Sequence, residues 1–255
     1  MSSHSATTTS TIPSLEESLV QSLPKTVYYI PNFISSAEEA QLLREIVSQP
    51  KPKWTILTHR RLQTHPSALT KNNVLLAAPL PPWLESIVPR MQQLKIWDNA
   101  PHKKPNHVLI NEYNPGEGIM PHEDGGAYFG CVATVSLGAS IVLDLYSKHT
   151  NADSGESGEA EAGAQKSTRF PKWRILQEPR SLLITTHDMY TDHLHGIQNI
   201  TVDEDLNETT VANWTLLGDK EVFSTGRYER QTRTSLTYRD VIKVSNVGKL
   251  FGGRK

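Results

Sequence analysis

The sequence predicts an α+β domain with an antiparallel β core. Helical patterns lie before His107, strand patterns dominate after it, and turn formers such as Asn114-Pro115-Gly116 separate the strands. Helices followed by closely spaced strands are typical of an α+β architecture. A double-sheet jelly roll is one way in which such a core closes.

Composition excludes several classes of protein. The chain has 255 residues, 37% of them hydrophobic and 21% charged, which fits a soluble globular protein. Its formal net charge of -1 gives no overall attraction to nucleic acid, so a nucleic-acid reader would need a local basic patch. Cys131 is the only cysteine, which excludes an internal disulfide and a multi-cysteine zinc site. No apolar stretch reaches the roughly 20 residues that a membrane span requires.

The first elements are a polar tail, a strand and a helix. Residues 1–22 are polar, and we expect them to be disordered. Val27–Ile30 is predicted as a strand because of its β-branched and aromatic content. Ser36 and Glu39 have the spacing of a capping box, which predicts a helix that ends before Pro50.

A second helix is predicted to begin near Pro82, and residues 23–105 are expected to form an N-terminal extension. The core is expected to span residues 106–245. Its strands are predicted at residues 107–113, 132–137, 141–146, 182–186 and 234–238.

Three polar segments are predicted outside the strands. Residues 148–168 are rich in Ala, Gly, Glu and Ser, which indicates a flexible insertion. Residues 203–230 are longer than an ordinary connection, so they are either disordered or form a rim over a site. Residues 246–255 are expected to be a solvated basic tail.

A histidine and a carboxylate two residues apart, His122 and Asp124, are the first candidates for chemistry. On a strand, residues i and i+2 point to the same face. With a second histidine they would form a two-His-one-carboxylate triad, which leaves positions open on Fe(II) for a co-substrate and oxygen. An isolated pair of this kind also arises by chance, so the neighbouring motifs decide whether it is a metal site.

Three further motifs accompany this pair: Asn111-Glu112-Tyr113, His195-Gly196-Ile197 and the segment from Arg233 to Arg239. Because the two arginines are six residues apart on a predicted strand, both face one side of it. The order N-x-Y, H-x-D, distal H and R-x-x-x-x-x-R resembles the AlkB-like family of Fe(II)- and 2-oxoglutarate-dependent dioxygenases. Within the family, residues 111–125 and 178–183 are most similar to the AlkB homologue six group.

The resemblance implies a fold and an iron site. The fold is a double-stranded β-helix (jelly-roll) core with N-terminal helices packed against it. The iron ligands and catalytic centre would be His122, Asp124 and His195. His193 is a rival to His195, and the Gly-Ile that follows His195 matches the family.

The resemblance also implies how 2-oxoglutarate is bound. Arg233 would pair with its distal carboxylate, for which a planar guanidinium is well shaped. Asn111 and Tyr113 would hydrogen-bond the co-substrate, and Ser235 would lie near it. Arg239 would lie beside the iron-side carboxylate or the substrate.

For the substrate, the resemblance places a recognition lid at residues 54–63. Arg60 and Arg61 are candidates to contact phosphates, and Tyr128 or Phe129 to stack on a base. The alternative interpretation is solvated basic loops and ordinary core aromatics.

The predicted function is oxidative demethylation of alkylated DNA or RNA by an enzyme that uses Fe(II), 2-oxoglutarate and O2. One alternative is a hydroxylase or demethylase of a protein or a small molecule, and another is a binding module that retains the metal site. We expect a monomer in the cytoplasm and nucleus without membrane partners.

Overall fold

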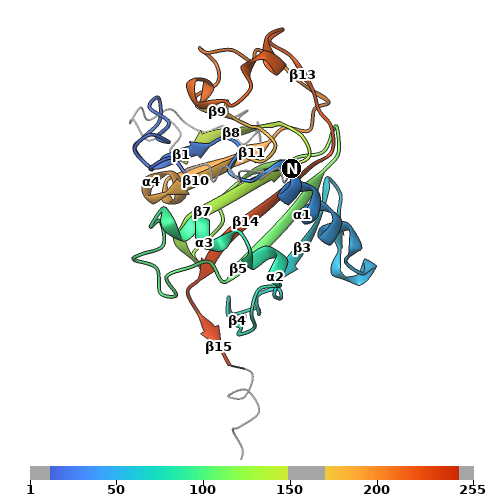
Figure 1. Cartoon of the computed structure of the whole chain (residues 1–255), viewed down its shortest axis with the longest axis vertical. Helices are drawn as coiled ribbons and strands as arrows, with labels where there is room; N and C mark the ends of the chain where they lie inside the picture. The colour runs from blue at the N-terminus through green and yellow to red at the C-terminus, as the bar shows by residue number, and fades with distance from the viewer. Residues whose placement is uncertain (1–11, 149–169, 247–255) are drawn as a thin grey trace, which may run out of the picture.

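Two antiparallel sheets form the framework of the protein (Figure 1). The computed structural model describes residues 12–148 and 170–246. The larger sheet runs in the order β1 (Val27–Ile30), β10 (Leu182–Thr186), β7 (Tyr128–Leu137), β14 (Arg233–Val241), β5 (His107–Tyr113), β3 (Arg60–His65) and β2 (Thr55–Leu57). The smaller sheet runs in the order β6 (Ile119–His122), β11 (His193–Ile197), β8 (Ile141–Ser147) and β9 (Trp173–Gln177).

Eight of these strands form a double-stranded β-helix. From β5 onward the chain passes back and forth between the sheets, so that β5, β7, β10 and β14 lie in one sheet and β6, β8, β9 and β11 in the other. The jelly-roll prediction is therefore confirmed. Each core strand that the sequence predicts lies within an observed strand, while β6, β9 and β11 have no counterpart among the predictions.

The strands β1, β2 and β3 extend the larger sheet on both sides of this core. β1 pairs with β10, and β3 pairs with β5 with Leu62 opposite Asn111. The predicted boundary between residues 105 and 106 therefore does not separate the sheet from the segment before it. The polar sequence of β3 does not predict a strand. The strand forms because its backbone pairs with β5.

The N-cap of the first helix, α1 (Ser36–Ser48), lies one residue earlier than predicted. Ser35 is the N-cap, and its side chain forms the capping box with Glu38. The carboxylate of Glu39 instead accepts hydrogen bonds from the Gly138 N–H at 2.8 Å and from Arg180 at 3.1 Å. The helix ends before Pro50, as predicted.

The second predicted helix is divided into α2 (Pro82–Glu85) and α3 (Val88–Gln93). Pro89 has no N–H to donate to the Glu85 carbonyl, which explains the interruption. Figure 1 shows α1, α2 and α3 in front of the larger sheet. One buried apolar cluster contains side chains from these helices and from the sheet: Leu42, Ile46, Leu84, Met91, Val108, Ile110 and Leu236.

Part of the predicted N-terminal tail is ordered. Ser18 accepts a hydrogen bond from the Tyr29 N–H at 2.8 Å, and Val20 is buried in a second apolar cluster with Val27. The prediction of disorder is therefore wrong for residues 12–22, because these side chains find apolar partners beside β1. The rest of that tail, residues 149–168 of the predicted insertion and residues 247–255 of the basic tail lie outside the described residues.

The segment 203–230 is also ordered. It contains the short helices η3 (Trp214–Leu216) and η4 (Lys220–Phe223), and β13 (Tyr228–Glu229) pairs with β12 (Val202–Asp203). Its apolar side chains, including Phe223, join the second cluster, and Arg230 forms a buried ion pair with Asp203 at 2.7 Å. None of its residues lines the cavity between the two sheets that contains His122 and Asp124, so the segment is not a rim over that site.

The remaining elements are η1 (Lys51–Lys53), β4 (Leu75–Leu76), α4 (His187–Thr191) and β15 (Val244–Ser245), of which β4 and β15 pair in parallel. Over residues 12–148 and 170–246, no helix has the length and apolar character needed to cross a membrane.

Candidate metal centre and co-substrate pocket

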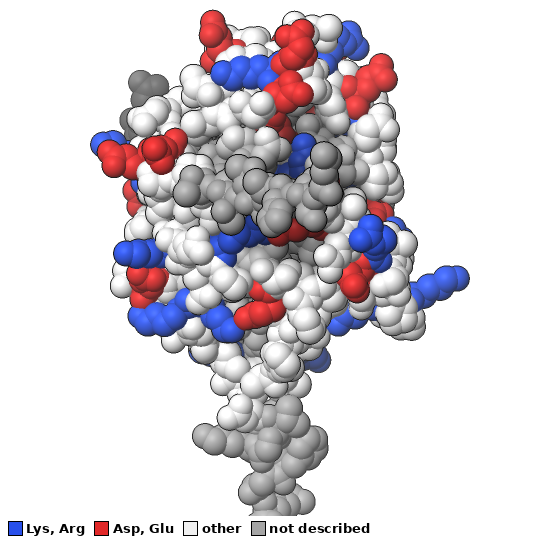
Figure 2. Space-filling model, viewed as in Figure 1, with Lys and Arg blue, Asp and Glu red and all other residues white. Residues whose placement is uncertain are grey.

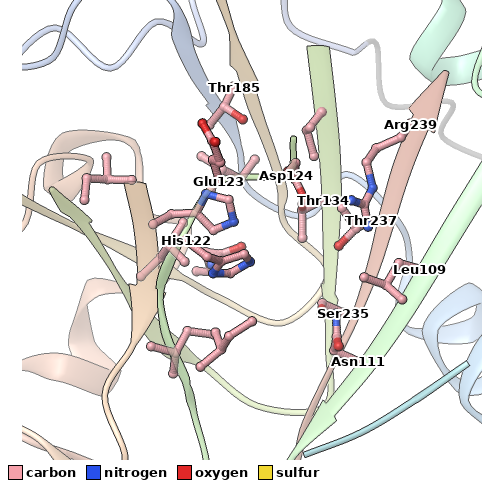
Figure 3. Close-up of a pocket in the computed structure, with 18 of the residues that line it drawn as sticks. Leu109, Asn111, His122, Glu123, Asp124, Thr134, Thr185, Ser235, Thr237 and Arg239 are labelled. Carbon is pink, nitrogen blue, oxygen red and sulfur yellow. Dashed lines mark hydrogen bonds and ion pairs between the residues drawn. The ribbon is translucent and has the colours of Figure 1, made fainter. Parts of the chain in front are cut away.

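A cavity of about 270 Å³ lies between the two sheets and contains most of the predicted site residues. Figure 3 shows His122 on one side of it and Asn111 and Ser235 on the other. The first side comes from the smaller sheet and the second from the larger sheet. The antiparallel fold thus places segments far apart in the sequence around one space.

His122, Asp124 and His195 form a cluster at the end of β6. One possible ligand atom from each residue lies within 4.8 Å of the others. The strand ladder explains the histidine pair, because His195 of β11 lies directly opposite His122 of β6, with ring centroids 4.4 Å apart. Asp124 follows just after β6 ends, and its side chain lies on the same side.

Backbone contacts fix the orientation of this cluster. The Nδ1 of His122 lies 2.9 Å from the Met120 carbonyl oxygen, which leaves Nε2 to face the cluster. A Cβ on Gly196 would lie 3.0 Å from the Pro121 nitrogen. The glycine after His195 therefore permits the close approach of β6 and β11 that brings the two imidazoles together.

Arg239 forms an ion pair with the carboxylate of the cluster. Its Nη1 lies 2.6 Å from Asp124 Oδ1, and its guanidinium stacks over the Tyr128 ring at 4.3 Å. Burial alone raises the pKa of Asp124, but Arg239 and the two histidines outweigh it, so that the net pKa is lowered. The carboxylate is therefore ionised, as metal binding requires.

His195 is the histidine that the fold places in the cluster. Burial lowers its pKa to about 4, so that the imidazole is neutral near pH 7. The rival His193 lies elsewhere: its Nδ1 is 3.1 Å from the Asp188 carbonyl oxygen, and its ring packs on Trp173 at 5.4 Å between centroids.

Arg233 is a buried cation without an acidic partner among the described residues. Its Nη2 donates to Ser136 Oγ at 2.8 Å and to Gln177 Oε1 at 3.1 Å, and its Nε has no hydrogen-bond partner. Burial lowers its pKa to about 10, so that it remains charged. A buried, incompletely bonded guanidinium is costly, and an anionic ligand would relieve that cost.

Four polar side chains lie near Arg233 along the cavity wall: Asn111, Tyr113, Ser235 and Arg60. Arg60 Nε donates to Asn111 Oδ1 at 3.2 Å. Burial raises the pKa of Tyr113, so that its hydroxyl keeps its proton.

Most of the predicted substrate residues lie outside the cavity. Arg60 lines it, but Arg61 forms an ion pair with Glu112 at 2.6 Å. Tyr128 supports Arg239, and Phe129 packs against the first apolar cluster. Tyr128, Phe129 and Arg61 are therefore not placed to contact a molecule in the cavity, because their side chains have partners in the fold.

The sequence analysis did not identify the residues that orient the predicted site residues through hydrogen bonds. Ser136 and Gln177 orient Arg233, and Tyr190 donates to the Gly125 carbonyl at 2.6 Å. Gln177 ends β9, a strand that the sequence did not predict. The signal available for Ser136 was its place as a polar residue in a predicted, mostly apolar strand.

The residues present fit an iron and a keto acid. Two imidazoles and one carboxylate are a donor set that suits Fe(II). The partly unbonded Arg233 in the same cavity fits a carboxylate of the co-substrate. The structure therefore provides both halves of a dioxygenase site.

Comparisons with known proteins agree with this geometry. Residues 26–239 match the model of the 2OG-Fe(II) oxygenase superfamily. The chain is 41% identical over 241 residues, covering 94% of this chain and 96% of the relative, to a protein of Danio rerio described as "Probable RNA/DNA demethylase ALKBH6". It is 28% identical to the uncharacterized protein L905 of Acanthamoeba polyphaga mimivirus, covering 84% of each chain. A tRNA (carboxymethyluridine(34)-5-O)-methyltransferase, alkbh8 of Xenopus tropicalis, is 28% identical over 89% of this chain and 33% of its own length.

The fold and the site thus define a dioxygenase, and the chain belongs to the 2OG-Fe(II) oxygenase superfamily, whose members use Fe(II), 2-oxoglutarate and O2. Within it, the chain is an AlkB-like protein similar to ALKBH6, which confirms the resemblance predicted from the motifs.

Proposed function

We propose that this enzyme oxidatively demethylates alkylated nucleic acid, either DNA or RNA. The observation that carries the proposal is the presence in one cavity of the His122, Asp124 and His195 cluster and the unpaired Arg233. The relative from Danio rerio, whose length the chain covers almost completely, is described as a probable RNA/DNA demethylase.

Fe(II) would be held by His122, Asp124 and His195. When bound together with 2-oxoglutarate and O2, it supplies an oxidant strong enough to break a C–H bond. Arg239 keeps the Asp124 carboxylate ionised and fixed in direction by their ion pair. The Nδ1 contact of His122 with the Met120 carbonyl fixes the direction of the imidazole.

2-Oxoglutarate would be held by Arg233, Asn111, Tyr113 and Ser235. Arg233 neutralises the distal carboxylate in a buried setting, where a charge-assisted hydrogen bond is strong. The protonated hydroxyl of Tyr113 and the hydroxyl of Ser235 supply neutral donors. Apolar side chains from the smaller sheet, Leu143, Leu145 and Ile197, line the same cavity and limit its water content.

The reaction at the substrate would remove an N-methyl group. Hydroxylation of the methyl carbon gives a hemiaminal, which releases formaldehyde and leaves the unmethylated nitrogen. The chain's contribution at this step is to orient the substrate and to exclude water, since the hemiaminal decomposes without further help.

A protein or small-molecule substrate is the second candidate. Acidic and basic side chains are interspersed on the face shown in Figure 2, and the formal net charge is -1. Tyr128 and Phe129, the aromatic residues considered for base stacking, have other partners. The charge pattern favours a substrate that is not bound through a broad basic surface, and the aromatic contacts favour one that is not held by base stacking on these two residues.

The first experiment measures succinate and formaldehyde release with Fe(II), 2-oxoglutarate and methylated DNA and RNA oligonucleotides. Wild-type enzyme is expected to release both products with at least one oligonucleotide, and His122→Ala is expected to release neither. His193→Ala is the matched control, because this histidine lies on β11 but packs on Trp173 outside the cluster. Full turnover by His122→Ala would refute the metal assignment.

The second experiment measures how salt affects binding to the oligonucleotides. A nucleic-acid enzyme should bind less tightly as salt increases, because phosphate contacts release counterions. Binding that does not depend on salt, together with turnover of 2-oxoglutarate alone, would favour the protein or small-molecule alternative. If the protein consumes no 2-oxoglutarate, either with or without an oligonucleotide, the binding-module hypothesis is favoured.

A further inference from the structure

Two adjacent arginines on β3 face opposite sides of the sheet. Arg61 lies opposite Glu112 and Leu62 opposite Asn111 in the ladder between β3 and β5. Because side chains alternate along a strand, Arg60 shares the face of Asn111, while Arg61 shares the face of Glu112. The contacts agree: Arg60 lines the cavity, and Arg61 pairs with Glu112 and stacks over Trp54 at 4.1 Å.

The contact between Arg60 and Asn111 determines how the amide is oriented. Arg60 Nε lies 3.2 Å from Asn111 Oδ1. A guanidinium only donates hydrogen bonds, so the atom that faces it must be the amide oxygen. The Nδ2 group of Asn111 has no hydrogen-bond partner among the described residues, so it can donate to an oxygen in the cavity.

The charge of Arg60 also acts on Tyr113, the second residue that we propose contacts the co-substrate. Burial raises the pKa of Tyr113, while the charges of Arg233 and Arg60 act in the opposite direction. Arg60 has no carboxylate partner in the part of the chain that the structure describes. Its one side-chain hydrogen bond, to Asn111, therefore points inward to the cavity rather than outward to a neighbouring loop.

We propose that Arg60 is a positioning residue for the keto-acid co-substrate. It holds the side-chain amide of Asn111 so that the NH2 group of Asn111 faces the cavity. The same hydrogen bond couples the β2–β3 hairpin to the co-substrate. This inference rests on the proposed function and gives Arg60 a different role from the phosphate contact that the sequence predicts.

The coupling has a thermodynamic consequence. If co-substrate binding is tightened by an ordered hairpin, then co-substrate binding must order the hairpin by the same free energy. The hairpin carries exposed apolar side chains, including Ile56 and Leu57. Loading of the co-substrate would therefore be transmitted to a surface next to the cavity before a substrate arrives.

A double-mutant cycle tests whether Arg60 acts through Asn111. The dissociation constant of 2-oxoglutarate is measured by calorimetry without oxygen, with Mn(II) in place of Fe(II), for Arg60→Ala, Asn111→Ala and the double variant. Arg60→Ala is expected to weaken binding by roughly tenfold, which corresponds to about 1.4 kcal/mol. In the Asn111→Ala background it should weaken binding less than about twofold, because the interaction is already lost.

Arg61→Ala is the matched control, because it removes the same charge from the neighbouring position outside the cavity. It should leave the dissociation constant within about twofold of wild type. Equal effects of Arg60→Ala and Arg61→Ala would overturn the inference, and so would additive effects in the cycle. If wild-type protein itself does not bind 2-oxoglutarate, the proposed function fails as well, so the two failures are distinguishable.

Hydrogen exchange at residues 55–62 supplies a readout that does not depend on turnover. Addition of 2-oxoglutarate and Mn(II) should slow exchange of these amides in wild-type and Arg61→Ala protein. The slowing should disappear in Arg60→Ala. Equal slowing in all three proteins would show that the hairpin is not coupled through Arg60.

Discussion

Arg239 Nη1 lies 2.6 Å from Asp124 Oδ1, and this ion pair joins the last long strand of the larger sheet to the metal cluster. Arg233 lies six residues earlier on the same strand and the same face, and no described acidic residue pairs with it. Arg233 and Arg239, which the six-residue spacing places on one face of the strand, therefore have different partners. Arg239 is already neutralised within the chain, whereas Arg233 is left for an anionic ligand.

Replacement of Arg239 by alanine is expected to weaken metal binding about 10- to 100-fold, the usual effect of removing a group that orients a ligand. Asp124 loses its ion pair, and its burial then favours the protonated form that does not bind metal. Titration with Co(II), followed by its absorption spectrum, measures the affinity. Arg61→Ala is the control, and an unchanged Co(II) affinity in Arg239→Ala would contradict the role assigned to the ion pair.

Replacement of Arg233 by alanine is expected to leave metal affinity near the wild-type value but to weaken 2-oxoglutarate binding by at least about 30-fold. Loss of one partner from a buried charge pair costs about 2–5 kcal/mol. Calorimetry with Mn(II)-loaded protein measures the binding. Arg233→Lys keeps the charge but cannot form the two-pronged contact, so its affinity should fall between the other two. Wild-type affinity in Arg233→Ala would place the keto acid elsewhere.

Most of the larger sheet was predictable from the sequence, because all of its strands except β2 and β3 obey simple patterns. β5 and β10 were located to the residue, since apolar and β-branched side chains occur where the buried faces require them. In the smaller sheet only β8 was predictable. β6 contains Pro121, which an edge strand tolerates, and β11 contains two histidines and a glycine. Functional residues thus conceal the strands that carry them.

The metal cluster could be predicted because its residues form short motifs, but their supporting contacts could not. Arg61 and Glu112 are 51 positions apart, and Arg239 reaches Asp124 over 115 positions. Such partners depend on the register between strands, which spacing within one segment does not reveal. For the same reason the sequence could not tell which of two adjacent arginines faces the cavity.

Replacement of Gly196 by alanine is expected to separate β6 from β11 and to weaken metal binding. The new Cβ would lie 3.0 Å from the Pro121 nitrogen and 3.1 Å from the Ile119 oxygen, both of which are backbone atoms that move only with their strand. Overpacking of this kind costs about 1–3 kcal/mol. Urea unfolding and Co(II) titration measure the two effects.

Gly126→Ala is the matched control for this prediction, because a Cβ at Gly126 would meet no atom within 4 Å. It should leave both the stability and the Co(II) affinity unchanged. If Gly196→Ala behaves like Gly126→Ala, the close approach of the two strands does not determine the geometry of the histidine pair.

Two buried histidines outside the metal cluster are expected to make the protein less stable in mild acid. His65 and His107 are each 2% exposed, and burial lowers the pKa of both to about 4. In the unfolded chain a histidine has a pKa of about 6.5. Between these values the unfolded state binds more protons, so the free energy of unfolding should fall as the pH is lowered from about 6.5 to about 4.

His107→Leu isolates one part of this effect. Neither ring nitrogen of His107 has a hydrogen-bond partner of ordinary geometry, so leucine removes the titrating group and, besides it, only a contact with the Ser67 backbone. Urea unfolding followed by tryptophan fluorescence should show that stability falls less between pH 7 and about pH 5 in His107→Leu than in wild type. Replacement of the exposed His59 by alanine should leave the wild-type pH dependence intact. The same loss of stability in His107→Leu and wild type would mean that a buried neutral His107 does not contribute to acid sensitivity.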